Sequence, residues 1–277
     1  MTAIDDYLFN EKEIERACNV IESTFGGDYF RRGTELLKDS DPSGPGMGRW
    51  PGGSRASKLL LAWHRSREEL TYAALEGYFR PGRYSAVIGV LGKSLEMLQQ
   101  VPEVKTAASG LLDDTAFDRT AFLLSVAAGF STANKGLSFP ATPEDFFFIG
   151  RQYAVSCLQA EAPSTPPPPG CSPDYLLSLI KPVNNVSAGR KQLIYIDISG
   201  QITALESIGG QLEKFRPALF EGLKPEVMAV ILCRSEFYPV AGGVCRKTYS
   251  FPVYNEKTPG QLQAEGLSVY LPGLVSG

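Results

Sequence analysis

The chain has 277 residues, of which 43% are hydrophobic and 21% charged, values typical of a globular protein able to bury a sizeable core. Its net charge of −3 argues against an overall basic surface built for nonspecific nucleic-acid binding. No apolar run reaches the roughly 18 residues of a membrane-spanning helix, so no membrane association is expected.

Cysteine usage and the N-terminus bear on location. Five cysteines are scattered without a CxxC pair, and with a single histidine, His64, a Cys/His zinc site is not expected. We interpret the cysteines as free thiols in a reducing compartment. The start, MTAIDDYLFNEKE, is acidic and lacks the basic segment and apolar core of a signal peptide. A cytoplasmic location is therefore predicted.

The first 108 residues are predicted to form a helical N-terminal region. Within residues 1–38, apolar residues from Ile14 to Phe25 recur at three- and four-residue spacing, which indicates a helix with one buried face. Residues 39–54 are too rich in Gly and Pro for helix or strand and are predicted to be a loop. This loop lacks the GKS/T ending of a nucleotide-binding P-loop. Residues 55–100 are predicted to form two helices, separated at Pro81-Gly82.

Basic residues are concentrated between residues 49 and 93, where eight Lys and Arg stand against three acidic residues. This excess suits a surface that contacts phosphates, or a region attracted to the more acidic segment that follows. The candidate nucleic-acid-binding residues are Arg49, Arg55, Lys58, Arg65, Arg67, Arg80 and Arg83. We interpret His64, beside Trp63, as a structural or surface histidine rather than a catalytic one.

Residues 109–277 are predicted to form an α/β domain. Asp113 and Asp114 are expected to cap a buried helix that reaches Phe130. GLSFP, EDFFFIG and QYAVSCLQAE are expected to be strands, the last two joined as a hairpin at Gly150-Arg151. A proline-rich loop and a helix from Pro173 come next, and then two apolar strands, QLIYIDIS and VMAVILC, with a helical segment between them. The predicted fold class is α/β, with a mixed central sheet flanked by helices.

This order of helix, hairpin, loop and helix, strand, helix and strand resembles the PD-(D/E)XK, or restriction-endonuclease-like, superfamily over roughly residues 110–240. The resemblance implies a nuclease-like core. Its chemistry needs two or three carboxylates around Mg²⁺ or Mn²⁺ ions, which activate a water and stabilise charge on the phosphate. In the family, an Asp opens the first hairpin strand and a (D/E)xK triplet lies on the second. Asp145, in Pro143-Glu144-Asp145, takes the Asp position.

The second hairpin strand departs from the family's pattern. The direct match to the triplet is Ser156-Cys157-Leu158, which holds neither a carboxylate nor a lysine, whereas a shifted register gives Gln159-Ala160-Glu161. Residues two apart on a strand share a face, so Gln159 and Glu161 would both lie beside Asp145. The implied catalytic residues are Asp145, Glu161, Gln159 and Lys181, and the implied metal ligands are Asp145, Glu161 and Asp118. As structural alternatives, Asp145 is a turn residue and Glu161 a solvated strand end.

Three hypotheses follow from these residues. In the first, the protein is nuclease-like but catalytically impaired, needs no cofactor, and binds nucleic acid or a protein partner as part of an assembly. In the second, it is an active nuclease that depends on Mg²⁺ or Mn²⁺. In the third, it is a protein-interaction adaptor with no nucleic-acid role. The missing lysine favours the first hypothesis.

Overall fold

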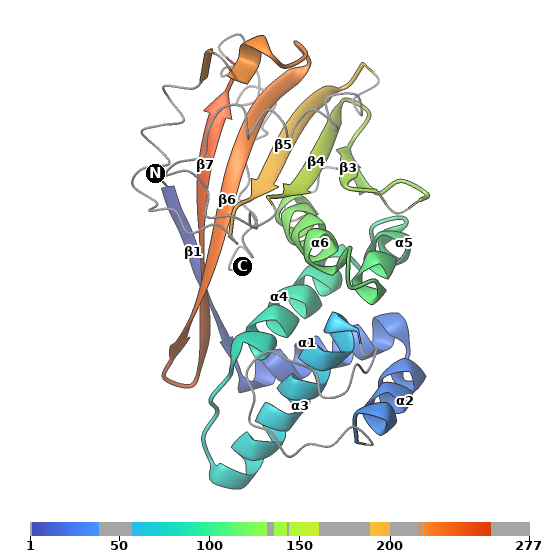
Figure 1. The fold of residues 1–277 in the computed structure, drawn as a ribbon, viewed down its shortest axis with the longest axis vertical. Helices are drawn as coiled ribbons and strands as arrows, with labels where there is room; N and C mark the ends of the chain where they lie inside the picture. Colours follow the sequence, from blue (N-terminus) through green and yellow to red (C-terminus); the bar gives the residue numbers. More distant parts are fainter. Residues whose placement is uncertain are drawn as a thin grey trace.

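The computed structural model describes residues 2–38, 57–131, 136–142, 144–160, 189–199, 216–217 and 219–255. Within them the chain forms a mixed sheet of seven strands with helices packed against it (Figure 1). The strands are β1 (Thr2–Asn10), β2 (Leu137–Ser138), β3 (Phe146–Ile149), β4 (Tyr153–Gln159), β5 (Lys191–Asp197), β6 (Val227–Val240) and β7 (Gly243–Tyr254). Across the sheet they run β1-β7-β6-β5-β4-β3-β2. Strands β4, β5 and β6 are parallel, and the other neighbouring pairs are antiparallel.

The centre of the sheet is apolar on both faces. On one face, Phe147 and Tyr195 pack against Phe130 of the neighbouring helix, with ring centroids 5.7 and 6.0 Å from that of Phe130. On the other face, Ile194 and Val230 are fully buried in a second apolar cluster. Strands covered on both sides read as continuous apolar runs, which is why the sequence predicted β5 and the first half of β6. The predicted mixed sheet flanked by helices is confirmed.

The helices are α1 (Glu11–Phe25), α2 (Gly27–Lys38), α3 (Lys58–Glu76), α4 (Arg83–Leu98), α5 (Val104–Ala108), the 3-10 helix η2 (Ser109–Leu112) and α6 (Phe117–Ser131). Helix α6 lies on the sheet against β4 and joins it to α4, which in turn packs on α1 and α3 (Figure 1). The helices predicted within residues 55–100 and the break at Pro81-Gly82 are confirmed.

The prediction of helix throughout residues 1–38 is wrong at its beginning. Residues 2–10 form β1, which pairs antiparallel with β7 at the edge of the sheet. The apolar spacing of a helix starts at Ile14, and the preceding Tyr7 and Phe9 are aromatic residues that suit a strand. Asn10 then begins α1 with a capping box, because its side chain accepts from the Glu13 N–H and the Glu13 carboxylate accepts from the Asn10 N–H. The sheet therefore contains a strand from the predicted N-terminal region.

The predicted cap of the buried helix also differs. Helix α6 begins at Phe117, later than Asp113 and Asp114 imply. The Asp113 carboxylate accepts from the N–H and hydroxyl of Thr115, at 2.9 and 2.8 Å, and so closes the preceding turn. Asp114 instead accepts from the Lys58 N–H at 2.6 Å and therefore caps α3, a helix that precedes it by some 50 residues. The sequence suggested that Asp114 caps α6, which follows it directly. Its hydrogen bond is made instead with α3, which is distant in sequence.

Strand β6 is longer than the predicted strand VMAVILC. Strand β6 pairs with β5 as far as Cys233 and then continues to Val240, where Ala241 and Gly242 turn the chain into β7. Gly242 has a φ of 77°, a conformation that favours glycine. The proline-rich loop, the helix from Pro173 and the loop at 39–54 lie outside the described residues.

Candidate functional site

Polar side chains gather where β4 and β5 end, beside the first turn of α6. The carboxyl ends of parallel strands are where ligands bind in many α/β proteins. Asp145 directly precedes β3, and its backbone carbonyl accepts from the Cys157 N–H at 2.7 Å. Because side chains alternate along a strand, Asp145, Cys157 and Gln159 share one face of the sheet. The predicted placement of Gln159 on the same face as Asp145 thus agrees with the register.

Asp145 is held by a cation from α6. The Nε of Arg119 lies 2.7 Å from Oδ1 of Asp145, and both side chains are partly exposed. Burial raises the pKa of the Asp145 carboxyl, and the guanidinium of Arg119 opposes that rise. The Asp145 carboxylate is therefore already paired with an arginine of the same chain.

A second carboxylate, Asp197, ends β5. It lies opposite Gln159 in register, and the Ala160 N–H donates to the Asp197 carbonyl at 2.9 Å. Its Oδ1 accepts from the N–H and the hydroxyl of Ser199, at 2.9 and 2.5 Å. The Ser199 hydroxyl oxygen in turn accepts from the Ser235 N–H at 2.9 Å and ties the end of β5 to β6. Burial raises the pKa of the Asp197 carboxyl, while the Ser199 hydrogen bonds and the charge of Arg246 lower it.

Arg246 on β7 is the buried cation of this region, with 6% of its surface exposed. Its guanidinium donates to the hydroxyls of Ser125, at 3.1 Å, and Ser235, at 3.0 and 3.3 Å. Ser125 lies on α6, so the arginine fastens that helix to the β6–β7 hairpin. Burial lowers the pKa of Arg246 to about 10, and the nearby Asp197 charge opposes this change. Sequence inspection missed Arg246 because its burial depends on α6, a helix some 120 positions away in the chain.

The start of α6 supplies one more ion pair. Asp118 Oδ2 lies 2.6 Å from the Nζ of Lys58, at the beginning of α3. The Asp118 charge also raises the pKa of Asp197, which places these two carboxylates in the same electrostatic environment. Two of the described acids, Asp118 and Asp145, are thus each matched with a basic side chain of this protein.

Two of the three predicted metal ligands, Asp145 and Asp118, belong to the described residues, and each is paired with a basic side chain. Glu161 and Lys181 lie outside those residues, and the two ion pairs measure 2.6 and 2.7 Å. No group of three or more His, Cys, Asp or Glu side chains suited to a metal ion occurs in the part of the chain that the structure describes. Mg²⁺ needs several hard oxygen ligands and compensating negative charge. Cys157, the residue opposite Asp145, offers such an ion no oxygen ligand.

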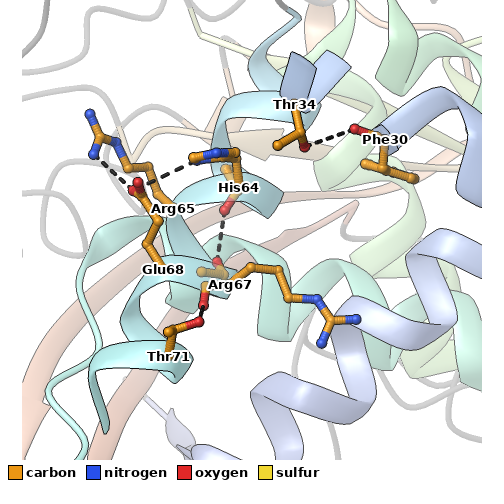
Figure 2. A network of polar contacts seen from close by, with 9 residues as sticks. Phe30, Thr34, His64, Arg65, Arg67, Glu68 and Thr71 are labelled. Carbon is orange, nitrogen blue, oxygen red and sulfur yellow. Dashed lines mark hydrogen bonds and ion pairs between the residues drawn. The ribbon is translucent and has the colours of Figure 1, made fainter. Parts of the chain in front are cut away.

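The predicted nucleic-acid-binding residues that the structure describes do not all lie on one side of α3. Arg49 and Arg55 lie outside the described residues. On α3, Arg65 lies 2.8 Å from Glu68, while Arg67 turns to Asn19 and Glu22 of α1. Figure 2 shows Arg65 and His64 both directed at Glu68, whereas Arg67 points the other way. His64 is thus a helix-surface residue beside a carboxylate, 3.6 Å from it.

Arg80 and Arg83 lie at the far end of α3 from Lys58. Helix α3 has 19 residues, which at 1.5 Å per residue separates its ends by about 27 Å. The guanidinium of Arg80 stacks 4.6 Å from the ring centroid of Tyr78. Of the predicted basic set, Lys58 is therefore the described member that lies beside the candidate site.

The chain was compared with protein families, curated proteins and solved structures. No family model, curated protein or solved structure matches this chain significantly. Among the helices that the structure describes, none combines the length and apolar character needed to cross a bilayer.

Proposed function

We propose that this is a nuclease-like protein with an impaired catalytic centre, which binds nucleic acid or a protein partner as part of an assembly in the cytoplasm. One observation carries the proposal: at the edge where a PD-(D/E)XK nuclease would hold metal ions, carboxylates are paired with Arg119 and Lys58. Helix α6, strands β2 to β4 and strands β5 and β6 follow the order on which the resemblance rests, which supports a nuclease-like origin.

The residues on the second hairpin strand support loss of catalysis. Cys157 lies opposite Asp145 and is completely buried, and burial raises the pKa of its thiol. A buried, protonated thiol is a poor ligand for a hard divalent ion. Gln159, the next residue on that face, offers a neutral amide where the family has a lysine or an acid. The four described cysteines, Cys18, Cys157, Cys233 and Cys245, are free and buried, which fits the proposed reducing compartment.

Phosphates can reach this edge by competing with the carboxylates for the same cations. Arg119 and Lys58 are 45% and 47% exposed at their side chains, so both can turn toward a ligand. A guanidinium binds a phosphate through two parallel hydrogen bonds, as it binds a carboxylate. The acidic neighbours weaken this attraction, and we therefore expect modest, strongly salt-dependent binding.

The first experiment is a cleavage assay on single- and double-stranded DNA and RNA with Mg²⁺ or Mn²⁺, comparing wild type with Asp145→Ala. We expect no cleavage by either protein. In a binding assay across a salt series, Arg119→Ala and Lys58→Ala should each lower the slope of log affinity against log salt by about one. Arg65→Ala is the matched control, because Arg65 pairs with Glu68 away from the site.

One outcome would contradict the proposal, and a second would narrow it to a protein partner. Cleavage that disappears in Asp145→Ala would establish an active metal-dependent nuclease and point to the Gln159/Glu161 register. Absence of nucleic-acid binding at low salt would leave protein interaction alone, as in the adaptor hypothesis.

A further inference from the structure

A hollow lies where the start of α1, the α3–α4 connection and the β6–β7 turn meet (Figure 1). Its volume is about 740 Å³, which falls in the range of pockets that bind small molecules. Both polar and apolar residues line it. The candidate site is at the opposite end of α3, beside Lys58, and shares no residue with this lining. The hollow is therefore separate from that site.

Two cations that are not engaged in ion pairs line the hollow. Lys12 and Arg80 are both exposed there. In the part of the chain that the structure describes, neither makes an ion pair, whereas Arg65 and Arg119 each lie within 2.8 Å of a carboxylate. Glu11 is the acid of the lining, so two positive charges stand against one negative charge. The hollow therefore attracts an anion.

The first turn of α1 adds to this attraction. Helix α1 has 15 residues, and the positive end of its dipole lies at Glu11 and Lys12, which line the hollow. The capping box uses the N–H groups of Asn10 and Glu13, which leaves those of Glu11 and Lys12 outside the cap. N–H groups at the start of a helix bind phosphate oxygens well. A phosphate beside Lys12 would thus meet backbone donors as well as the ammonium group.

A flat wall stands beside these charges. The guanidinium of Arg80 lies 4.6 Å from the ring centroid of Tyr78, and the tyrosine remains 48% exposed. Phe79, the residue between them, is buried and lines the hollow as well. Tyrosine rings and guanidinium planes are the surfaces on which proteins stack nucleobases. The lining therefore suits a ligand that joins a flat ring to a phosphate.

We propose that this hollow binds a nucleotide, with its base against the Tyr78–Arg80 pair and its phosphate beside Lys12. A free mononucleotide and the phosphorylated end of a nucleic-acid strand share this chemistry. Glu11 opposes a dense negative charge, so a monophosphate fits the lining better than a triphosphate. The inference does not depend on nucleic-acid binding at the candidate site, because the two places have no residue in common.

Isothermal titration calorimetry of the full chain with adenosine 5′-monophosphate tests the proposal, and we expect a dissociation constant below about 1 mM. Adenosine and inorganic phosphate, which each lack half of the contacts, should bind at least about 10-fold more weakly. Arg80→Gln, Lys12→Gln and Tyr78→Leu should each weaken binding of the monophosphate about 5- to 10-fold. Arg65→Gln is the matched control, because Arg65 is an exposed arginine of α3 outside the hollow, and it should leave the affinity unchanged.

Glu11→Gln tests the sign of the charge effect. Removing this acid should tighten binding of the monophosphate about 2- to 5-fold, a gain that a merely structural role of Glu11 would not produce. Circular dichroism checks that each variant remains folded. Failure of the wild type to bind the monophosphate at about 5 mM overturns the proposal. So does binding that neither Arg80→Gln nor Tyr78→Leu weakens.

Two further titrations separate the sources and the sites. A trinucleotide with a 5′-phosphate that binds more tightly than the monophosphate, and is weakened by Arg80→Gln, would identify a strand end as the ligand. Tighter binding of the free monophosphate would identify a mononucleotide. Arg119→Ala, which tests the candidate site, should leave the affinity for the monophosphate unchanged. Loss of monophosphate binding in Arg119→Ala, with Arg80→Gln unaffected, would place the nucleotide at the candidate site and overturn this inference.

Discussion

Arg246 shows how a single buried charge organises the candidate site. Its guanidinium is satisfied by two hydroxyls, from Ser125 and Ser235, and its charge compensates the partly buried Asp197. Removing one member of a buried charged pair leaves the other without compensation. The stability of the fold and the ionisation of Asp197 are therefore coupled through this arginine.

We predict that Arg246→Met lowers the free energy of unfolding by about 3 kcal/mol near pH 7. The difference in the free energy of unfolding between this variant and the wild type should become smaller toward about pH 4. The pKa of Asp197 is raised in the folded protein, so its contribution to stability is present below its unfolded pKa and is lost as pH rises through the folded pKa. Without Arg246 the pKa of Asp197 in the folded protein rises further. Ionisation of Asp197 therefore costs the variant more stability than it costs the wild type.

Urea unfolding of both proteins across this pH range checks the prediction. Arg65→Met, which removes an exposed ion pair with Glu68, is the control and should cost under about 1 kcal/mol with little pH dependence. A deficit for Arg246→Met that stays constant with pH would show that Asp197 does not depend on the arginine.

At the scale of elements, α4 and α1 approach each other closely at Gly92 and Ala17. A Cβ built on Gly92 would lie 2.4 Å from Cα of Ala17, so the helices meet where α4 has no side chain. We predict that Gly92→Ala destabilises the protein by about 2 kcal/mol, because backbone must move to accommodate the methyl group. The measurement is the urea midpoint of unfolding.

Gly27→Ala is the matched control. Gly27 is also helical, at the start of α2, and an added Cβ meets nothing within 4 Å. There alanine should stabilise by up to about 1 kcal/mol, since it favours helix over glycine. Equal effects of the two substitutions would mean that the crossing of α1 and α4 is looser than the structure shows.

The strands also show which parts of the structure could be predicted from the sequence. Strands β5 and β6 were identifiable because burial on both faces leaves a continuous apolar run. Strand β1 was missed because its pairing with β7 depends on a segment some 240 positions away. The common face of Asp145 and Gln159 was predictable from alternation within one hairpin. The Asp197–Ser199–Ser235 connection and the anchoring of Arg246 to Ser125 were not, since both depend on register between distant strands.

At the scale of the whole molecule, the predicted boundary after residue 108 does not divide independent packing units. Strand β1 belongs to the sheet, and α4 contacts both α6 and β7. We predict that residues 109–277 expressed alone will not fold cooperatively, because α6 would expose the side that α4 covers. Urea unfolding and circular dichroism of this fragment, beside the full chain, provide the check. A cooperative transition in the fragment would establish that the boundary is real.

The pairing of β1 with β7 also sets the order of events during synthesis. Tyr7 leaves the ribosome long before Arg246, with which it pairs, so β1 must wait while nearly the whole chain is translated. At roughly 5–20 residues per second this interval lasts on the order of tens of seconds. During that time the backbone of β1 lacks its partner strand, so this edge of the sheet is completed late in folding.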